Sequence, residues 1–344
     1  MNSKQHFSSS LVLLGIFLLI IVGVYTDVNR ILSKITSTLV LSKASLTQSI
    51  SVDINLENGG GEIDEPDNSE PLVISYLAPP PTILPARDWS VQIPEITAQS
   101  YFVLDGQTNT ILLNKGENEK RPVASLTKLV TAFIALKYIP PSAPILVSAE
   151  AAATEGKAGD LFAGESLSFY DALAALLLPS SNDAAEALAG YMGRDKFISL
   201  MNEEVKNMGI NDASFKNPSG LDETGQYATA KGIINIFRSD LNIETLKNLL
   251  SKSIYETRSL DGKIYHRFVT SNWLLGSFPG VVAGKTGFTD EAGQSLVVAW
   301  RPPESSAIER KESLPVVYAV ILGSQDRFGD MRAILEWLSK AYHW

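Results

Sequence analysis

The chain has 344 residues, of which 45% are apolar, enough to form a real hydrophobic core in one large domain or two. Its formal net charge is −9, which argues against a nucleic-acid partner, because phosphate binding requires clustered lysine and arginine. With no cysteine there are no disulfides, thiolate nucleophiles or zinc–thiolate sites, and the three scattered histidines suggest no metal site, so we expect no cofactor.

The first predicted element is an apolar segment at residues 7–26. No Asp, Glu, Lys or Arg occurs between Lys4 and Asp27, and about 20 residues are just enough to cross a hydrocarbon core as a helix. No small-residue cleavage site follows the segment, so we favour an uncleaved transmembrane anchor over a cleaved signal segment. The flanking charges do not set its orientation, because basic residues lie on both sides.

An acidic, Gly- and Pro-rich stretch follows the apolar segment. Residues 51–90 contain eight acidic side chains against one basic residue, Arg87. Such a composition predicts a disordered linker that repels itself, with an r.m.s. span of roughly 45 Å between the membrane and a folded domain. We assign residues 27–92 to this linker and leave the structure of residues 27–50 open.

From about Ile93 the sequence takes on the patterns of a folded domain. Residues 100–116 alternate around the turn sequence DGQTNT, which predicts a β-hairpin. A helix is predicted from Ser125 to about Lys137, ended by a Pro-Pro pair. Residues 171–192 predict two further helices joined at the sequence PSSN.

The last part of the chain predicts three strands, at residues 280–289, 295–302 and 314–323, and then an amphipathic helix over 328–344. Because helices fill the middle and strands lie at both ends, we expect one α+β domain over 93–344, whose sheet is built from both termini. We expect the last helix to pack on the core rather than to bind a membrane.

A polar pair at the start of the first apolar helix carries the first chemical signal. Ser125 and Lys128 are three residues apart, so on a helix their side chains lie within hydrogen-bond reach. A serine hydroxyl needs a base to become a nucleophile, and a buried lysine with a lowered pKa can be that base. A Ser-His scheme would depend on His266 alone, since His6 and His343 lie at the chain ends. The Ser-x-x-Lys spacing by itself is weak evidence.

Two further motifs strengthen the signal. The SSN sequence at 180–182 lies at the break between two predicted helices, where a serine and an asparagine two apart can face the same way. The KTG sequence at 285–287 lies in a predicted strand, where Lys285 and Gly287 share a face and the glycine lets a ligand backbone approach. In this order, SxxK, SxN and KTG match the motif set of penicillin-binding proteins and class A β-lactamases.

On these motifs, and on the longer stretches RPVASLTKLVTA, SSNDAAEALA, NPSGLDETGQYATA and GKTGFTDEAGQSLVVA, the chain resembles the low-molecular-weight penicillin-binding D-alanyl-D-alanine carboxypeptidases, the S11 serine peptidases. The resemblance implies a DD-peptidase/β-lactamase-like fold: an antiparallel sheet flanked by helices, a helical subdomain, and the site between them. It also implies the substrate, peptidoglycan stem peptides ending in D-Ala-D-Ala, and β-lactams as inhibitors.

The resemblance further implies which side chains carry out the reaction. Ser125 would be the acylating nucleophile and Lys128 its general base. Ser180 would relay a proton to the departing D-alanine amine. Asn182 would orient Lys128 and the substrate amide. All four positions are carried over from the family's SxxK and SxN motifs, and not from spacing alone.

The substrate-binding positions implied by the resemblance follow the KTG motif. Lys285 would keep the local field positive and attract the terminal carboxylate of the substrate. Thr286 and Thr289 would hydrogen-bond that carboxylate. Gly287 would let the substrate backbone approach, and the backbone N–H of Phe288 would form the oxyanion hole together with that of the nucleophile.

One departure and three alternatives remain. Some relatives carry a carboxylate-binding arginine just before KTG, but VTSNWLLGSF contains none, and NPSGLD (217–222) reads as a structural turn. A DD-endopeptidase that cuts peptide cross-links would use the same site. A class A β-lactamase needs a glutamate-held water, for which Glu223 is the available residue. A non-catalytic peptidoglycan-binding module would need none of the nucleophile, base and KTG lysine.

The expected substrate determines the expected location. Peptidoglycan lies outside the cytoplasmic membrane, so the catalytic domain would have to be exported. Residues 1–6 would then be cytoplasmic, residues 7–26 would span the membrane once, and residues 27–92 would tether the domain on the outer side.

Overall fold

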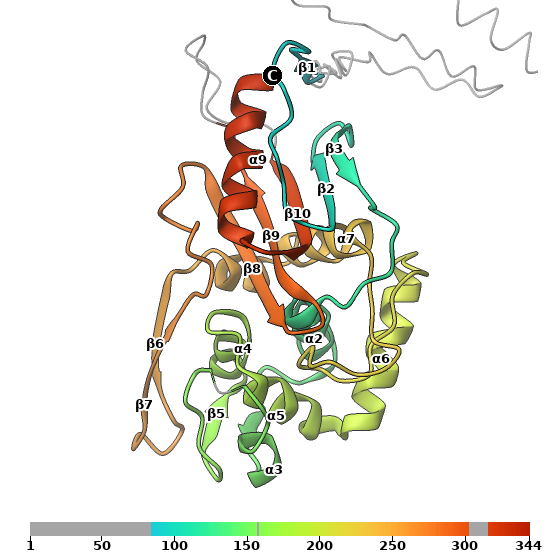
Figure 1. Cartoon of the computed structure of the whole chain (residues 1–344). Coiled ribbons are helices and arrows are strands. Elements are labelled where there is room, and N and C mark those ends of the chain that lie inside the picture. Colours follow the sequence, from blue (N-terminus) through green and yellow to red (C-terminus); the bar gives the residue numbers. More distant parts are fainter. Residues whose placement is uncertain (1–83, 157, 303–315) are drawn as a thin grey trace, which may run out of the picture. The chain divides into compact units, whose positions relative to one another are not determined.

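The computed structural model describes residues 84–156, 158–302 and 316–344 (Figure 1). All of them belong to one compact unit. The predicted anchor at 7–26 and nearly all of the predicted linker lie outside these residues. In the part of the chain that the structure describes, no helix is long and apolar enough to cross a membrane.

The described secondary structure mixes helices and strands along the chain. In order, the elements are β1 Ala86–Arg87, β2 Ser100–Asp105, β3 Ile111–Lys115, the 3-10 helix η1 Ala124–Leu126, α2 Thr127–Tyr138, β4 Pro144–Leu146, α3 Ala149–Ala152, β5 Ser166–Ser168, α4 Phe169–Leu177, α5 Asn182–Met192, α6 Arg194–Asn207, α7 Ala230–Leu241, α8 Glu244–Leu250, β6 Ile254–Arg258, β7 Tyr265–Val269, β8 Val281–Thr289, β9 Gly293–Trp300, β10 Val317–Ser324, α9 Arg327–Ala341 and β11 Tyr342–His343.

A five-stranded antiparallel sheet with strand order β3-β2-β10-β9-β8 forms the centre of the fold. The hairpin β2–β3 joins the C-terminal strands because β2 pairs with β10, with Ser100 opposite Leu322 and Asp105 opposite Val317. The prediction of a sheet built from both ends of an α+β domain is therefore confirmed. β8 is an edge strand, and among the described residues its outer side has no neighbouring strand.

The two faces of the sheet bury different cores. In β9, Leu296, Val298 and Trp300 share a core with α9, whereas Val297 and Ala299 share the opposite core with helices α2 and α4 to α8. This division follows from the two-residue period of a strand, which sends successive side chains to opposite faces. Figure 1 shows α9 along one face of β9 and β10. The last helix therefore packs on the core, as expected.

The helical part of the fold brings the motif segments to one end of β8. α2 begins directly after η1, and its apolar run is buried almost throughout. α4 and α5 are separate helices because the chain breaks at the PSSN turn, where Ser181 caps α5 by accepting a hydrogen bond from Ala184 N at 3.2 Å. The helices predicted from periodicity are confirmed, with α2 ending at Tyr138.

The hairpin β6–β7 was not predicted. Its two strands pair over five positions and reach the helical part through side-chain and backbone contacts. Tyr255 donates its hydroxyl to Asp171 Oδ1 at 2.9 Å, and Leu260 N donates to Ser166 O at 2.8 Å. The sequence did hold a signal, because an Asp-Gly pair ending at Gly262 lies between alternating segments.

The start of the domain corrects the predicted boundary at residue 93. Residues Ala86 and Arg87 form β1, which pairs with β11, and the Arg87 guanidinium lies 4.0 Å from the ring centre of Trp89. The segment was assigned to the linker because a two-residue strand is too short to show alternation and because its neighbours are acidic and Pro-rich. The folded unit thus begins before Ile93.

Candidate active site

The predicted nucleophile and base lie side by side where η1 passes into α2. Ser125 is the middle residue of η1 and Lys128 the second residue of α2, and Lys128 Nζ lies 2.8 Å from Ser125 Oγ. The preceding residue, Ala124, has φ +47°, a left-handed conformation that L-residues other than glycine rarely adopt. Backbone strain of this kind is typical of functional sites, where the surrounding structure must hold it in place.

The contacts of Lys128 allow it to act as a base when its amine is neutral. Besides the serine, Nζ lies 2.6 Å from Asn182 Oδ1 and 2.6 Å from Ser219 O. Both of these oxygens only accept hydrogen bonds, so they take the two protons of a neutral amine. The nitrogen lone pair then faces the hydroxyl of Ser125, which is the geometry required for proton abstraction.

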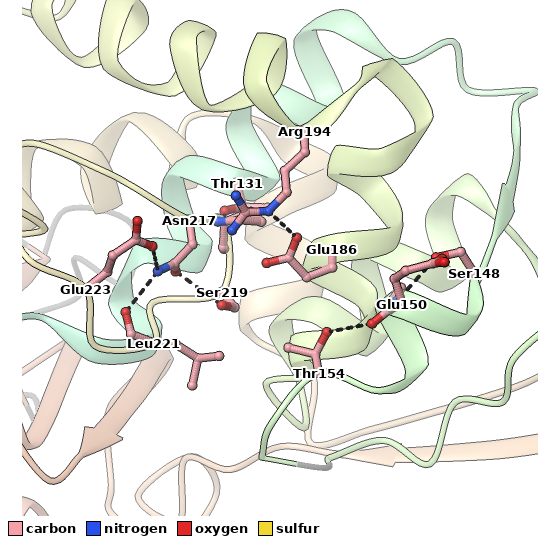
Figure 2. A network of polar contacts seen from close by, with 12 residues as sticks. Thr131, Ser148, Glu150, Thr154, Glu186, Arg194, Asn217, Ser219, Leu221 and Glu223 are labelled. Carbon is pink, nitrogen blue, oxygen red and sulfur yellow. Dashed lines mark hydrogen bonds and ion pairs between the residues drawn. The ribbon is translucent and has the colours of Figure 1, made fainter.

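The environment of Lys128 favours this neutral form. The side chain is fully buried, and burial is the largest cause that lowers the pKa of Lys128 well below its usual range. The positive charge of Lys285 lowers the pKa further, whereas the carboxylate of Glu186 opposes the shift. The carboxylate of Glu186 is itself paired with Arg194 at 3.0 Å, as Figure 2 shows.

The turn between α4 and α5 supplies the two SxN residues. Ser180 has φ +71° and places its Oγ 2.6 Å from Lys285 Nζ on β8. Asn182 is held from its other side because its Nδ2 donates to Glu155 O at 2.6 Å. Its Oδ1 is thereby fixed toward Lys128, so the turn connects both lysines of the site.

Lys285 is buried in β8 and is held by oxygen acceptors. Its Nζ donates to Ser180 Oγ at 2.6 Å and to Thr286 O at 3.1 Å. Burial, and then the nearby charge of Arg327, lower the pKa of Lys285 to about 7. The group can therefore be a cation at neutral pH and lose its proton on mild alkalinisation.

The KTG glycine allows β8 to lie against the nucleophile. A Cβ on Gly287 would come within 3.0 Å of Val123 O and 3.2 Å of Ser125 N, so a larger residue would push the strand away. The next residue, Phe288, exposes more than half of its side chain beside the site. The free side of this edge strand can pair with an extended peptide, since unpaired backbone groups of an edge accept a further strand.

Arg327 enters the site from the first turn of α9, and the sequence interpretation missed it. Its Nη1 donates to Gly287 O at 2.8 Å, while its buried Nε has no hydrogen-bond partner among the described residues. Only the segment before KTG, where some relatives carry a carboxylate-binding arginine and this chain has none, was considered for that role. A signal was nevertheless present, because a cation at the first position of a helix opposes the helix dipole and favours a nearby anion.

The two threonines of the KTGFT sequence have different surroundings. The Thr286 hydroxyl lies 2.5 Å from Ser271 Oγ, on the segment that leads from β7 to β8. The Thr289 hydroxyl donates to Asp222 Oδ1 at 2.6 Å and accepts from Ala292 N at 3.1 Å. Both threonines thus lie on the KTG strand, but the hydroxyl proton of Thr289 is already used in its hydrogen bond to Asp222.

The NPSGLD turn contributes more than was predicted. Besides Ser219 O, which accepts a hydrogen bond from Lys128, Pro218 O accepts the hydroxyl of Thr131 from α2 at 2.6 Å. Asn217 holds the turn, since its Nδ2 donates to Leu221 O at 3.0 Å (Figure 2). Gly220 has φ +86°, and a Cβ there would lie 2.0 Å from the carbonyl oxygen of Ala124. The turn therefore supports the strained backbone beside the nucleophile.

Two residues of the alternative schemes lie in other settings. His266 is buried on β7, with Nε2 2.8 Å from Glu165 Oε2. Glu223 accepts a hydrogen bond from Asn217 Nδ2 at 3.0 Å and so belongs to the turn itself. Among the described residues the hydrogen-bond partner of the His266 ring is Glu165 and not Ser125, so the structure gives no support to a Ser-His scheme. In the described residues no cluster of three or more His, Asp or Glu side chains suits a metal ion.

Comparison with known proteins places this geometry in a family. Residues 87–308 match the model of the family described as D-alanyl-D-alanine carboxypeptidase, Peptidase S11. The chain is 30% identical over 219 residues to the D-alanyl-D-alanine carboxypeptidase DacF of Bacillus subtilis, covering 61% of this chain and only 56% of that protein. It is 29% identical over 213 residues to DacB2 of Mycobacterium tuberculosis, covering 61% of this chain and 72% of that protein.

Solved structures show the same fold. A D-alanyl-D-alanine carboxypeptidase from Mycobacterium tuberculosis matches with a TM-score of 0.64 and 25% identity, over 73% of this chain and 94% of that one. The Streptomyces K15 DD-transpeptidase matches with a TM-score of 0.65 and 25% identity, over 72% of this chain and 98% of that one. The mixed fold with an antiparallel sheet and flanking helices, inferred from the resemblance, is therefore confirmed.

Proposed function

Because the chain belongs to the D-alanyl-D-alanine carboxypeptidase family of S11 peptidases, we propose that it is a serine D-Ala-D-Ala carboxypeptidase that removes the terminal D-alanine from peptidoglycan stem pentapeptides. One observation carries the proposal. The Nζ of the buried Lys128 lies 2.8 Å from Ser125 Oγ and 2.6 Å from each of Asn182 Oδ1 and Ser219 O, so that a neutral amine donating to the latter two would point its lone pair at the hydroxyl of Ser125. Binding a peptide requires no such arrangement, so the geometry favours catalysis over a non-catalytic binding module.

The proposed acylation step uses these groups in turn. Lys128 takes the proton of Ser125 as Oγ attacks the carbonyl carbon of the penultimate D-alanine and forms the new C–O bond. The negative charge on the carbonyl oxygen is stabilised by the backbone N–H groups of Ser125 and Phe288. The C–N bond then breaks, and Ser180 relays the proton from Lys128 to the departing amine of D-alanine.

Deacylation restores the enzyme. A water molecule adds to the acyl carbon and gives a proton to Lys128. The C–O bond to Ser125 breaks, the serine oxygen regains its proton from Lys128, and the shortened peptide leaves with a new carboxylate. A penicillin follows the first step, but its leaving group stays tethered, so we propose that it forms a lasting acyl adduct.

The terminal carboxylate of the substrate fits the end of the site formed by the KTG strand and α9. Lys285 supplies positive charge, Thr286 supplies a hydroxyl, and Arg327 supplies a guanidinium whose Nε has no partner among the described residues. A bare anion in a partly buried site requires several such donors. We propose that Arg327 takes the place of the arginine that is absent from the segment before KTG. Thr289 remains a proposed donor from the family resemblance.

The alternatives within the same chemistry depend on the leaving group. A DD-endopeptidase would use the same nucleophile on a peptide cross-link, where the leaving group is larger. A β-lactamase would need a glutamate that holds a water molecule, but the carboxylate of Glu223 is bound within its own turn. The family match favours the carboxypeptidase over both alternatives.

We also propose that the protein is anchored in the cytoplasmic membrane with its catalytic domain outside. The supports are the uncharged apolar segment 7–26, the acidic linker, and a substrate that lies beyond the membrane. Protease added to intact spheroplasts should degrade the catalytic domain of the full-length protein. Protection of the domain until the membrane is lysed would contradict this orientation.

The activity is tested by incubating the purified protein with a stem pentapeptide and with a cross-linked peptide dimer. Mass spectrometry should detect free D-alanine and the tetrapeptide from the pentapeptide, and none from the Ser125→Ala variant. Cleavage of the dimer alone would favour the endopeptidase. No product from either substrate would contradict the proposed function.

A further inference from the structure

A serine outside the three sequence motifs lies at the carboxylate end of the site. Ser271, on the segment between β7 and β8, has its Oγ 2.5 Å from the hydroxyl of Thr286. Its backbone N–H donates to Leu178 O at 2.9 Å, two residues before Ser180. Ser271 therefore contacts both the KTG strand and the segment that leads into the SxN turn, which are joined at the site by the bond from Lys285 to Ser180.

The chemistry of two adjoining hydroxyls restricts what this pair can do. Each hydroxyl carries one proton, and the bond between Ser271 and Thr286 uses one of the two. Whichever group donates, one O–H of the pair remains for a further acceptor, and it is the O–H of Thr286 when Ser271 donates. The mutual bond also fixes the rotamer of Thr286, so the remaining proton has a defined direction. Beside it stand the cationic Lys285 and Arg327, which favour an anion as the acceptor.

Thr289, which carries the other hydroxyl on this strand, already uses its proton in a hydrogen bond within the fold. Its proton is donated to Asp222 Oδ1 at 2.6 Å, and its oxygen accepts from Ala292 N at 3.1 Å. To serve a substrate carboxylate it would have to give up Asp222, whose own negative charge repels such a group. The pair formed by Ser271 and Thr286 carries no comparable penalty.

We propose that Ser271 is a positioning residue that sets carboxylate specificity: through Thr286 it directs a hydroxyl proton at the terminal carboxylate of the substrate. The inference rests on the proposed function, because it names how that same site recognises the end of its peptide. It differs from the family-based assignment, which relies on Thr286 and Thr289 and gives Ser271 no role.

The test compares two substrates that differ only at this end. The full-length protein is assayed on an N-acylated tripeptide ending in D-Ala-D-Ala and on its C-terminal carboxamide, and the acid-to-amide ratio of kcat/KM is measured. Ser271→Ala should lower this ratio at least about tenfold, as expected if the Thr286 hydroxyl loses the partner that directs its hydrogen bond toward a charged group. Ser271→Thr, which keeps the hydroxyl, should restore most of it.

Two further variants make the result specific. Ser277→Ala is the matched control, because this serine lies on the same segment and its hydroxyl donates only to Trp273 O among the described residues. Its ratio should equal that of the wild type. Thr289→Val should reduce the ratio less than Ser271→Ala does.

The outcomes separate the inference from the proposed function. If the wild type cleaves the acid but Ser271→Ala lowers kcat/KM equally for the acid and the amide, the residue is merely structural and the inference is overturned. A ratio that falls in Thr289→Val and not in Ser271→Ala would overturn it as well. If the wild type cleaves neither substrate, the proposed function itself fails.

Discussion

At the scale of single residues, the state of one lysine determines the proposed reaction. Lys128 is fully buried, and its nitrogen has three oxygen neighbours within 2.8 Å. Two of them, Asn182 Oδ1 and Ser219 O, accept only, so the third, Ser125 Oγ, is where a lone pair can act. Arginine at this position would keep a positive charge and most of the side-chain volume but would supply no base.

Lys128→Arg should therefore slow acylation by penicillin by several orders of magnitude, because arginine does not lose its proton near neutral pH. The measurement is the rate of adduct formation, with the thermal unfolding midpoint as a check on the fold. His266→Gln, which keeps a donor for Glu165, is the control and should retain most of the rate. A Lys128→Arg protein that acylates at a near-normal rate would exclude the lysine as base.

The second residue-scale prediction concerns pH. Burial and the charge of Arg327 lower the pKa of Lys285 to about 7, and the proposed role needs its protonated form. The pH dependence of kcat/KM reports the pKa values of the free enzyme, so kcat/KM should fall as pH rises through about 7. The substrate carboxylate favours the cation, so the alkaline limb of kcat should lie at higher pH. The Lys285→Arg variant keeps its positive charge, so its kcat/KM should no longer fall with pH near 7. An unchanged decrease in this variant would contradict the assignment of that pKa to Lys285.

The site also shows which residues the sequence could reveal. Ser125, Lys128 and the SxN and KTG motifs could be assigned to one candidate site because their combination and order resemble a known family, whereas each spacing alone is weak evidence. Ser219 acts through its backbone carbonyl, which any residue type possesses, and so leaves no compositional signal. Ser271 and Arg327 come from segments far from the nucleophile in sequence and reach the site only through the tertiary fold.

At the scale of secondary-structure elements, α7 holds an unusual buried group. Asp240, in its last turn, is fully buried, and neither carboxylate oxygen has a hydrogen-bond partner among the described residues. Burial raises the pKa of Asp240 well above its usual range. The carboxyl is therefore neutral in the folded protein over a pH range in which it is ionised in the unfolded chain.

This difference predicts a pH-dependent effect of Asp240→Asn. Below about pH 4 both states of the wild type are protonated at this site, so the variant should differ little from it. As pH rises from there toward the raised folded-state pKa, the wild type loses stability relative to the variant by about 1.4 kcal/mol for each pH unit. Free energies of unfolding at pH 4 and pH 8 measure this. A gap that does not widen with pH would contradict a buried, unpaired carboxyl.

Helices and strands could be predicted where the apolar pattern in the sequence extends over many residues. The helices α2, α4 and α5 and the strands β8 to β10 were foreseen because their apolar runs are buried in the fold. The hairpin β6–β7 was missed because it presents polar side chains such as Glu256 and Arg267 to solvent, and alternation alone had to identify it. β1 and β11 are two residues each, and only their pairing makes them strands.

At the scale of the whole molecule, the sheet explains how distant segments form one site. β2 enters between β3 and β10, so the two ends of the domain complete a single sheet whose edge strand carries KTG. The helices between them bring SxxK and SxN to that edge. The order of the predicted elements suggested a sheet built from both ends of the domain. It did not predict the strand register, which sets Lys285 opposite Val297 and so fixes which residues face Ser125.

The most direct test of this account is to locate the acyl adduct. The full-length protein is incubated with penicillin, digested, and examined by mass spectrometry for the modified peptide. The account predicts a long-lived adduct on Ser125 that is absent in Ser125→Ala and strongly reduced in Lys128→Arg. Labelling that persists in Ser125→Ala, or an adduct on any other residue, would contradict it.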